Sequence, residues 1–255
     1  MTIDYTIVAL LIIAGFFAGA INAVAGGGPL ITLPLLIFTG IDARVANLTS
    51  TVALLPGQLA TGYAARDGLR RTGGIGTGLL IAISIAGGAV GAILLLTTPS
   101  TVFAGLVPWL VLVATAIYAW SNFGSAWVDK GQVGMQRPIG PVGFAAAQTA
   151  SAIYGGYFGG GNSFVMLALL TVAGLAARDA GQLKNLLISL INMAAAGVFL
   201  LSSAVAYDKA IPLGLGAIGG SLAGAALLHR MNERILKIIV VAIGVGLTLW
   251  LFRSA

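Results

Sequence analysis

Apolar residues form ten stretches along this chain, separated by short polar or glycine-rich intervals. A helix needs about 20 apolar residues to cross a bilayer. The stretches cover residues 5–25, 29–39, 45–65, 74–97, 102–121, 139–158, 162–173, 183–206, 210–229 and 235–252. The pattern predicts an all-α polytopic membrane protein with 8–10 membrane elements.

Two of these stretches, 29–39 and 162–173, are too short to cross a bilayer alone. At 1.5 Å per residue each reaches about 16–18 Å, against a hydrocarbon core of about 30 Å. Each follows three consecutive glycines, which are poor helix residues. Irregular backbone at membrane depth is tolerated only where protein or a water-filled cavity surrounds it. We therefore expect two half-helices, each forming a re-entrant or broken unit with the preceding span, as in the binding sites of transporters.

The two halves of the chain share elements in one order. The pairs lie 133 or 134 residues apart: glycines 26–28 with 159–161, Gly87 with Gly220, Gly91 with Gly224, and Arg44 with Arg178. A constant offset over several elements favours an internal duplication. We predict a first repeat over residues 1–121, a linker over 122–138 and a second repeat over 139–255, in one integral membrane domain. We expect the four paired glycines outside the triplets to serve helix packing.

The positions of the basic residues predict how the repeats are oriented. If each broken unit counts as two elements, ten of the 13 Lys and Arg residues face one side and three face the other. If each unit crosses once, the split is seven to six. The positive-inside rule favours the first arrangement. Five elements per half then place both termini outside and make the halves inverted-topology repeats.

Composition excludes several classes of protein. Only 8% of residues are charged and 58% are hydrophobic, whereas soluble domains carry about 25% charged residues. There is no cysteine and one histidine, His229, so we expect no metal centre and no cofactor. A net charge of +6 suggests nucleic acid in a soluble protein, but loops that orient a membrane protein explain it here. No P-loop run is present, which argues against direct use of ATP.

Acidic residues are confined to predicted helix ends and loops, so the chain offers no obvious mid-span proton relay. The nearest candidate is Asp179, before the 183–206 stretch. We expect it to cap that helix or to pair with Arg178 or Lys184.

Uncharged polar residues cluster beside both glycine breaks. A half-helix start presents free N–H groups and a partial positive charge, which suits an anion. Pro29 fits a first helical position, Asn162 or Ser163 fits a cap, and Lys184 adds a full charge. We therefore predict a cradle for a small oxyanion. The candidate substrate-binding residues are Gly26, Gly27, Gly28, Asn47, Thr51, Gly159, Gly160, Gly161, Asn162, Ser163, Lys184 and Asn185.

Two interpretations stay open for part of this region. The same Asn, Ser and Thr side chains are also suited to hydrogen bonds between helices. Tyr154 and Tyr157, which precede the second break, either line the site or pack against neighbouring helices.

One family carries a similar sequence. The stretch from Ala18 to Leu36, AGAINAVAGGGPLITLPLL, followed by Gly40 and by ANLTS at 46–50, closely resembles the TauE/SafE family of sulfite exporters, or toluene sulfonate uptake permeases. Residues 155–161 and 180–192 resemble its second repeat. The resemblance implies transport of sulfite, sulfonates or related sulfur-containing anions. The second half departs from the family pattern at Lys184 and Asn185, where a Thr-Ser pair is expected.

We accordingly predict a secondary transporter of a small anion, sulfite or an organosulfonate, working by alternating access in the bacterial inner membrane. An anion channel is the nearest alternative. An intramembrane enzyme is a more distant one, because His229 lies at a span end and no Ser–Lys pair is matched. The partners to consider are the anion, the lipid bilayer, a coupling ion (H⁺ or Na⁺) and a second copy in a homodimer.

Overall fold

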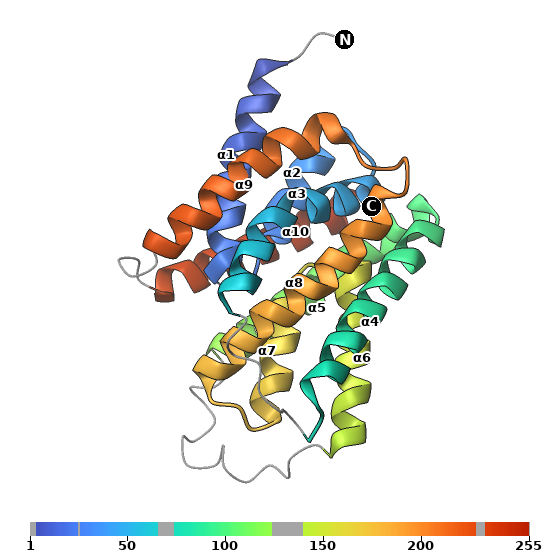
Figure 1. Cartoon of the computed structure of the whole chain (residues 1–255). Helices are drawn as coiled ribbons and strands as arrows, with labels where there is room; N and C mark the ends of the chain where they lie inside the picture. Colours follow the sequence, from blue (N-terminus) through green and yellow to red (C-terminus); the bar gives the residue numbers. More distant parts are fainter. Residues whose placement is uncertain (1–3, 25, 66–73, 124–139, 228–232, 255) are drawn as a thin grey trace.

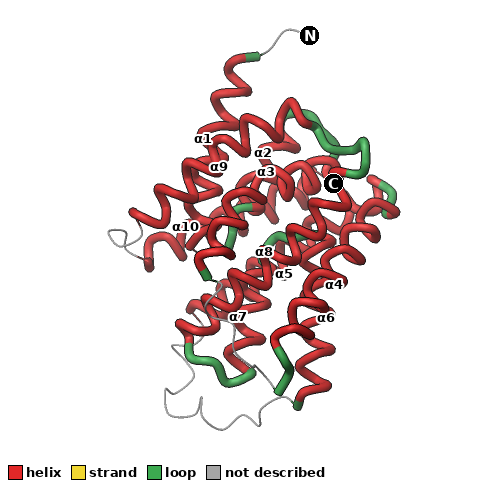
Figure 2. Tube along the Cα trace, in the orientation of Figure 1, coloured by secondary structure: helices red, strands yellow, loops and turns green. Residues whose placement is uncertain are grey.

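The structure is a computed structural model that describes residues 4–24, 26–65, 74–123, 140–227 and 233–254 (Figure 1). Within these ranges the chain forms helices and no strand (Figure 2). The helices are α1 (Tyr5–Val24), α2 (Pro29–Phe38), α3 (Ala43–Ala64), α4 (Thr77–Thr97), α5 (Ser100–Phe123), α6 (Pro141–Tyr157), α7 (Asn162–Val172), α8 (Ala177–Leu200), α9 (Tyr207–Leu227) and α10 (Glu233–Ser254).

The short helices α2 and α7 start where the glycine breaks predict. The largest difference is in α8, which begins and ends six residues before the expected stretch. The apolar run starts only at residue 183, but the preceding turn is also helical and carries Asp179, whose negative charge suits a helix start. α3 begins at Ala43 because Asp42 caps it, accepting hydrogen bonds from the amides of Arg44 (2.9 Å) and Val45 (3.3 Å).

The helices pack in pairs that relate the two halves. α1 lies along α9 and α6 lies along α4, while α3 and α8 pack against each other in the middle (Figure 1). Exchanging α1–α5 with α6–α10 maps each of these pairs onto another pair or onto itself. Of the substantial contacts between described helices, one, α3 with α5, lacks such a counterpart. This is the packing expected of two copies of one five-helix unit.

Close contacts between residues show how the two helices of a pair run relative to each other. In α3 and α8, Gln58 meets Asn192 and Gly62 meets Ser189, so the two equivalent helices run antiparallel. Equivalent elements therefore point in opposite directions, as inverted-topology repeats require. The linker predicted over 122–138 lies outside the described residues, apart from its first two, which end α5.

The paired glycines outside the triplets allow backbones to touch, which confirms the packing prediction. A Cβ atom at Gly91 would overlap the carbonyl oxygen of Ile153 in α6. A Cβ atom at Gly220 would overlap the carbonyl oxygen of Phe16 in α1. Such approaches replace the hydrophobic effect, which does not drive helices together in lipid.

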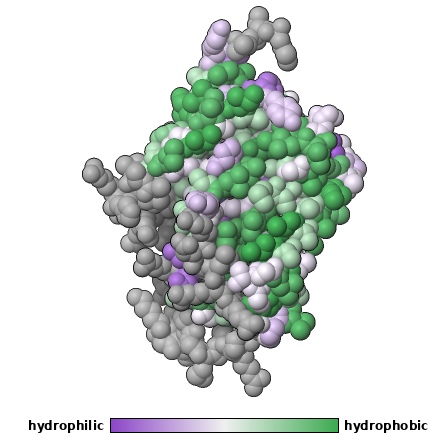
Figure 3. Space-filling view, viewed as in Figure 1, coloured by the Kyte–Doolittle hydropathy of each residue, from purple (hydrophilic) through white to green (hydrophobic). Residues whose placement is uncertain are grey.

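The outer surface is apolar, as a bilayer requires. On the face in Figure 3 hydrophobic residues cover most of the described surface. Four described helices are long and apolar enough to cross a membrane, over Tyr5–Ala23, Thr77–Thr97, Ser100–Ile117 and Asp179–Leu200. α3 is less apolar because it carries buried polar residues from Asn47 to Gln58. The chain is thus an all-α polytopic membrane protein.

The predicted charge asymmetry remains a prediction. Many of the basic residues that carry it lie outside the described residues: Arg66, Arg70, Arg71, Lys130, Arg137 and Arg230. His229 lies outside them as well.

Candidate functional site

Both glycine breaks are tight turns that only glycine adopts comfortably. Gly26 has φ +77°, Gly159 +73° and Gly161 +76°, all in the left-handed region. The Gly26 amide donates to the carbonyl of Asn22 (3.0 Å), which ends α1, and Pro29 occupies the start of α2, as predicted. The triple glycines therefore reverse the chain between each long helix and its short partner.

The two turns face different parts of the same centre. A Cβ atom at Gly26 would overlap the hydroxyl of Ser163, so the first turn touches the first turn of α7. A Cβ atom at Gly159 would lie 3.9 Å from Thr51 Oγ1, so the second turn faces α3. The structure thus brings together residues from both repeats that the sequence singled out.

Some of the polar groups at the start of α2 form hydrogen bonds within the protein. The Gly28 amide donates to Asn22 Oδ1 (3.4 Å), and Pro29 has no N–H to satisfy. Thr32 Oγ1 hydrogen-bonds to the carbonyl of Gly28 (3.3 Å) and to the Ser50 hydroxyl. These bonds join the start of this half-helix to its own neighbours.

The start of α7 is buried against neighbouring residues and has no side-chain cap. Its N-cap is Gly161, which has a left-handed conformation and no side chain that could cap the helix. The prediction that Asn162 or Ser163 caps α7 is therefore wrong, because Asn162 is already the first helical residue. Within the described ranges the amides of Gly160, Gly161 and Ser163 show no backbone acceptor.

Asn162 is buried at this helix start with half of its amide unpaired. It is 1% exposed, and its Oδ1 accepts a hydrogen bond from Ser151 Oγ (3.0 Å). Its Nδ2 has no partner among the described residues. Gly155 makes room for this group, since a Cβ atom there would overlap Nδ2.

Lys184 is the one charged side chain that is buried in the described part of the chain, at 6% exposed. It makes no hydrogen bond and no ion pair with the described residues, and its Nζ atom is not among the fully buried unpaired atoms. At the offset of 134 it corresponds to Ser50, which contacts the first turn of α2. α8, which carries Lys184, packs on α7.

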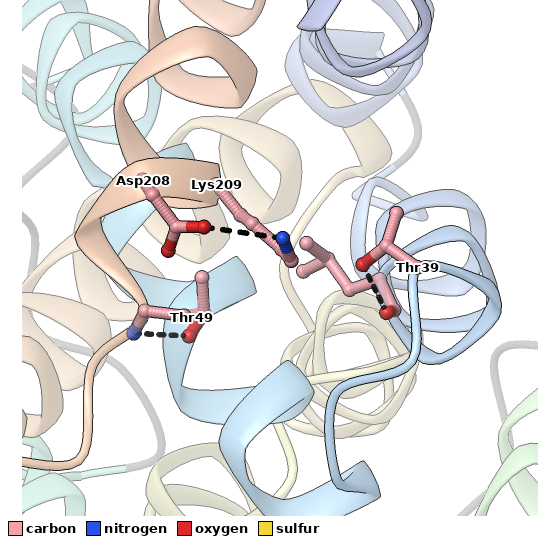
Figure 4. A network of polar contacts seen from close by, with 6 residues as sticks. Thr39, Thr49, Asp208 and Lys209 are labelled. Carbon is pink, nitrogen blue, oxygen red and sulfur yellow. Dashed lines mark hydrogen bonds and ion pairs between the residues drawn. The ribbon is translucent and has the colours of Figure 1, made fainter. Parts of the chain in front are cut away.

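The other basic side chains near this region are engaged. Arg44 Nη1 donates to the carbonyls of Leu96 (3.1 Å) and Thr98 (3.0 Å), which closes the end of α4. Lys209 pairs with Asp208 (3.1 Å) at the start of α9, close to Thr49, whose hydroxyl accepts from the Ala206 amide (Figure 4).

Asp179 neither caps α8 nor pairs with Lys184, and its predicted pairing with Arg178 stays a prediction. α8 has Ala176 as its N-cap, and no ion pair joins the described side chains of Asp179 and Lys184. The side chain of Arg178, the other expected partner, lies outside the described residues. Asp179 places a negative charge in the first turn of α8, which suits a helix start.

The candidates beside the second turn are used in holding it. Asn47, 1% exposed, donates from Nδ2 to the carbonyl of Tyr157 (3.1 Å), and Thr51 Oγ1 donates to the carbonyl of Asn47 (3.0 Å). Tyr154 donates from its hydroxyl to the carbonyl of Gly160 (2.8 Å). Asn185 is half-buried, and its carbonyl accepts from Ser189 Oγ (2.7 Å) beside Gly62 of α3. Only the Asn47 bond joins two helices, α3 and α6, so the interhelical interpretation holds for Asn47.

Sequence reasoning missed a polar pair between the repeats. Asn192 Nδ2 donates to Gln58 Oε1 (2.6 Å), and Ser189 Oγ donates to the Gln58 carbonyl (2.6 Å). Gln58 and Asn192 are 134 residues apart, so equivalent positions meet on the axis that relates the halves. The offset of 134 residues between the repeats could have pointed to this pair.

Comparison with known proteins finds relatives over the full length. The family profile described as "Sulfite exporter TauE/SafE" matches residues 11–251. "Probable membrane transporter protein ORF9" of Sinorhizobium sp. is 30% identical over 254 residues, 98% of this chain and 94% of that protein. "Probable membrane transporter protein" of Haemophilus influenzae is 27% identical over 97% of this chain and 95% of its own length. "Probable membrane transporter protein YfcA" of Escherichia coli K12 is 25% identical over 92% and 85%. No solved structure matches.

Proposed function

Because this chain belongs to the sulfite exporter TauE/SafE family, we propose that it is a secondary transporter of a small anion, sulfite or an organosulfonate, in the bacterial inner membrane. Its relatives are named membrane transporter proteins, and we propose transport rather than catalysis. The observation that carries the anion assignment is Lys184, a buried cation without a partner in the described residues.

The energetics of Lys184 support an anionic ligand. A buried ion without a partner costs several kcal/mol even after the protein relaxes. A bound anion would offset that cost, and the start of α7 carries amide donors of the kind that hold sulfate and phosphate groups. Binding would thus complete an arrangement that the protein leaves unsatisfied.

The candidate residues take two roles in this proposal. Lys184, Asn162, Ser163 and the glycines 159–161 contact the anion, and glycines 26–28 let the first repeat approach it closely. Asn47 holds the backbone of the second turn through its bond to the Tyr157 carbonyl, and Thr51 and Asn185 flank the site in this proposal.

Alternating access follows from the paired architecture. The repeats (1–121 and 139–255) would rock against each other where α3 and α8 cross, so that the anion faces each side of the membrane in turn. An inward gradient of H⁺ or Na⁺ is the proposed driving force. A homodimer is compatible with this scheme, which needs only one chain.

Uptake of labelled sulfite into proteoliposomes tests the proposal. We expect saturable uptake that Lys184→Gln lowers at least about tenfold, because the anion loses its countercharge. Lys209→Gln is the matched control and should leave uptake unchanged, since Lys209 already pairs with Asp208. Unchanged uptake in Lys184→Gln would remove the lysine from the site, and flux that does not saturate would indicate a channel.

A further inference from the structure

The most extensive helix contacts divide the molecule differently from the two halves of its sequence. We propose that the moving parts of this transporter are two four-helix bundles, each built from three helices of one repeat and one helix of the other. The first bundle is α1, α2, α3 and α9, and the second bundle is α6, α7, α8 and α4. This inference rests on the proposed function and names the units between which alternating access takes place.

Contacts between helices define the two bundles. α9 packs along α1 and against α3, and α4 packs along α6 and against α8, while α2 and α7 pack on the other helices of their own repeat. Between the bundles, the one extensive contact among the described residues is that of α3 with α8. α5 and α10 pack on each other and make smaller contacts with the bundles. In Figure 1 the first bundle lies largely above the second.

Within each bundle, helices of different repeats touch backbone to backbone. A Cβ atom at Gly15 of α1 would overlap the carbonyl oxygen of Leu213 in α9. In the second bundle, a Cβ atom at Gly88 of α4 would overlap the carbonyl oxygen of Ile191 in α8. Contacts of this kind hold helices together in lipid and are lost when the helices separate. Each bundle is therefore expected to move as one unit.

The seam between α3 and α8 is held by side chains instead. Ser189 Oγ of α8 lies within hydrogen-bond distance of two carbonyls, that of Gln58 in α3 (2.6 Å) and that of Asn185 in its own helix (2.7 Å). A hydroxyl has one hydrogen to donate, so Ser189 keeps a partner when the helices separate. The Gln58 carbonyl keeps one as well, because Thr61 Oγ1 also donates to it (2.9 Å). Separation of these two groups therefore leaves neither unpaired.

Gln58 and Asn192 mark the pivot of this seam. They are equivalent residues of the two repeats and bond to each other, so they lie on the axis that relates the halves. For inverted repeats that axis lies in the plane of the membrane. Rocking that exposes first one side of the membrane and then the other turns about the same axis. This pair therefore stays together while the two ends of the seam part in turn.

The two ends of the seam differ in this structure. Near the start of α3, Asn47 Nδ2 donates to the Tyr157 carbonyl of α6, and Arg44 donates to the Thr98 carbonyl at the end of α4. Both bonds join the first bundle to the second. The position equivalent to Asn47 in α8 is Gly181, which has no side chain for such a bond and faces open space. We therefore expect the end at the start of α3 to be closed here and to part later in the cycle.

A disulfide between the repeats but inside the first bundle tests the exchange of helices. A Cβ atom at Gly224 of α9 would lie 3.2 Å from the Cβ of Ala20 in α1, near the roughly 3.5–4.5 Å found in disulfides, and the chain has no other cysteine. For Ala20→Cys/Gly224→Cys in proteoliposomes, we expect equal uptake of labelled sulfite after oxidation and after reduction, because the two helices move together. A loss of at least about tenfold on oxidation would mean that the sequence halves move apart, and would overturn the proposal.

A link between the bundles should have the opposite effect. Arg44→Cys and Thr98→Cys place one thiol on each bundle at the closed end of the seam, and a reducible bifunctional thiol reagent of the length of the lost arginine side chain joins them. We expect this reagent to lower uptake at least about tenfold and a reductant to restore it, because this end must part in every cycle. Unchanged uptake in a fully linked protein would contradict the proposal.

Distances between spin labels give a readout that needs neither transport nor a disulfide. Phe17 of α1, Leu222 of α9 and Val142 of α6 are exposed, so each accepts a label after substitution by cysteine. We expect one distance between Phe17→Cys and Leu222→Cys, within the first bundle. Between Leu222→Cys and Val142→Cys, across the seam, we expect more than one distance. Equally broad distributions, or one distance for each pair, would count against the bundles.

The outcomes also separate this inference from the function on which it rests. If sulfite is transported but the disulfide between residues 20 and 224 stops uptake, only the bundle inference fails. If several distances occur across the seam in a protein that does not transport sulfite, the proposed substrate fails and the bundles stand.

Discussion

Lys184 differs from Arg44 and Lys209 in what surrounds its charge. The other two residues end in contacts with carbonyl or carboxylate oxygens, and Lys184 is buried without such a contact in the described residues. In the proposed function, the anion is bound by this one side chain and by the backbone of the second glycine turn. The proposed anion binding therefore depends on the geometry of the glycine turns.

Gly26 gives a prediction about that geometry. Gly26→Ala should destabilise the protein by about 1–2 kcal/mol or more and reduce transport, because an alanine at φ +77° is strained and its Cβ overlaps Ser163. Gly105→Ala, in α5, is the matched control because a Cβ atom there meets open space. Thermal unfolding in detergent measures both variants. Equal melting temperatures for the two would show that the turn tolerates a side chain.

At the scale of helices, the pairs are held together by close backbone contacts. α1 and α9 contact each other through glycines and small residues, and so do α4 and α6. Each repeat therefore packs against a helix of the other repeat. This intertwining explains why neither half would be expected to keep its site without the other.

Two adjacent glycines in α9 test that contact. Gly220→Ala should lower the melting temperature, because its Cβ overlaps the Phe16 carbonyl and would push α1 away. Gly219→Ala should be neutral or stabilising by up to about 1 kcal/mol, since its Cβ would meet only Phe16 at 3.8 Å and alanine is the better helix former. A similar loss of stability in both variants would contradict the packing described for α1 and α9.

Much of the molecule could be predicted from apolar run lengths and the repeated glycines. These features anticipated the half-helices α2 and α7, and the distribution of basic residues predicted the inverted halves to which the antiparallel α3 and α8 belong. They did not anticipate that Asn22 bonds the Gly28 amide or that Gly161 is the N-cap of α7, because these details depend on the geometry of the turn. The role of Arg44 was also hidden, since its acceptors lie more than 50 residues away.

Whole-molecule asymmetry is the central claim: one anion binds per chain, between Lys184 and the start of α7. A structure with bound methanesulfonate tests it most directly. The account predicts sulfonate oxygens at about 2.7–3.2 Å from Lys184 Nζ and from the amides of residues 160–163. A ligand held at the start of α2 instead, with Lys184 turned towards lipid or bulk water, would contradict it.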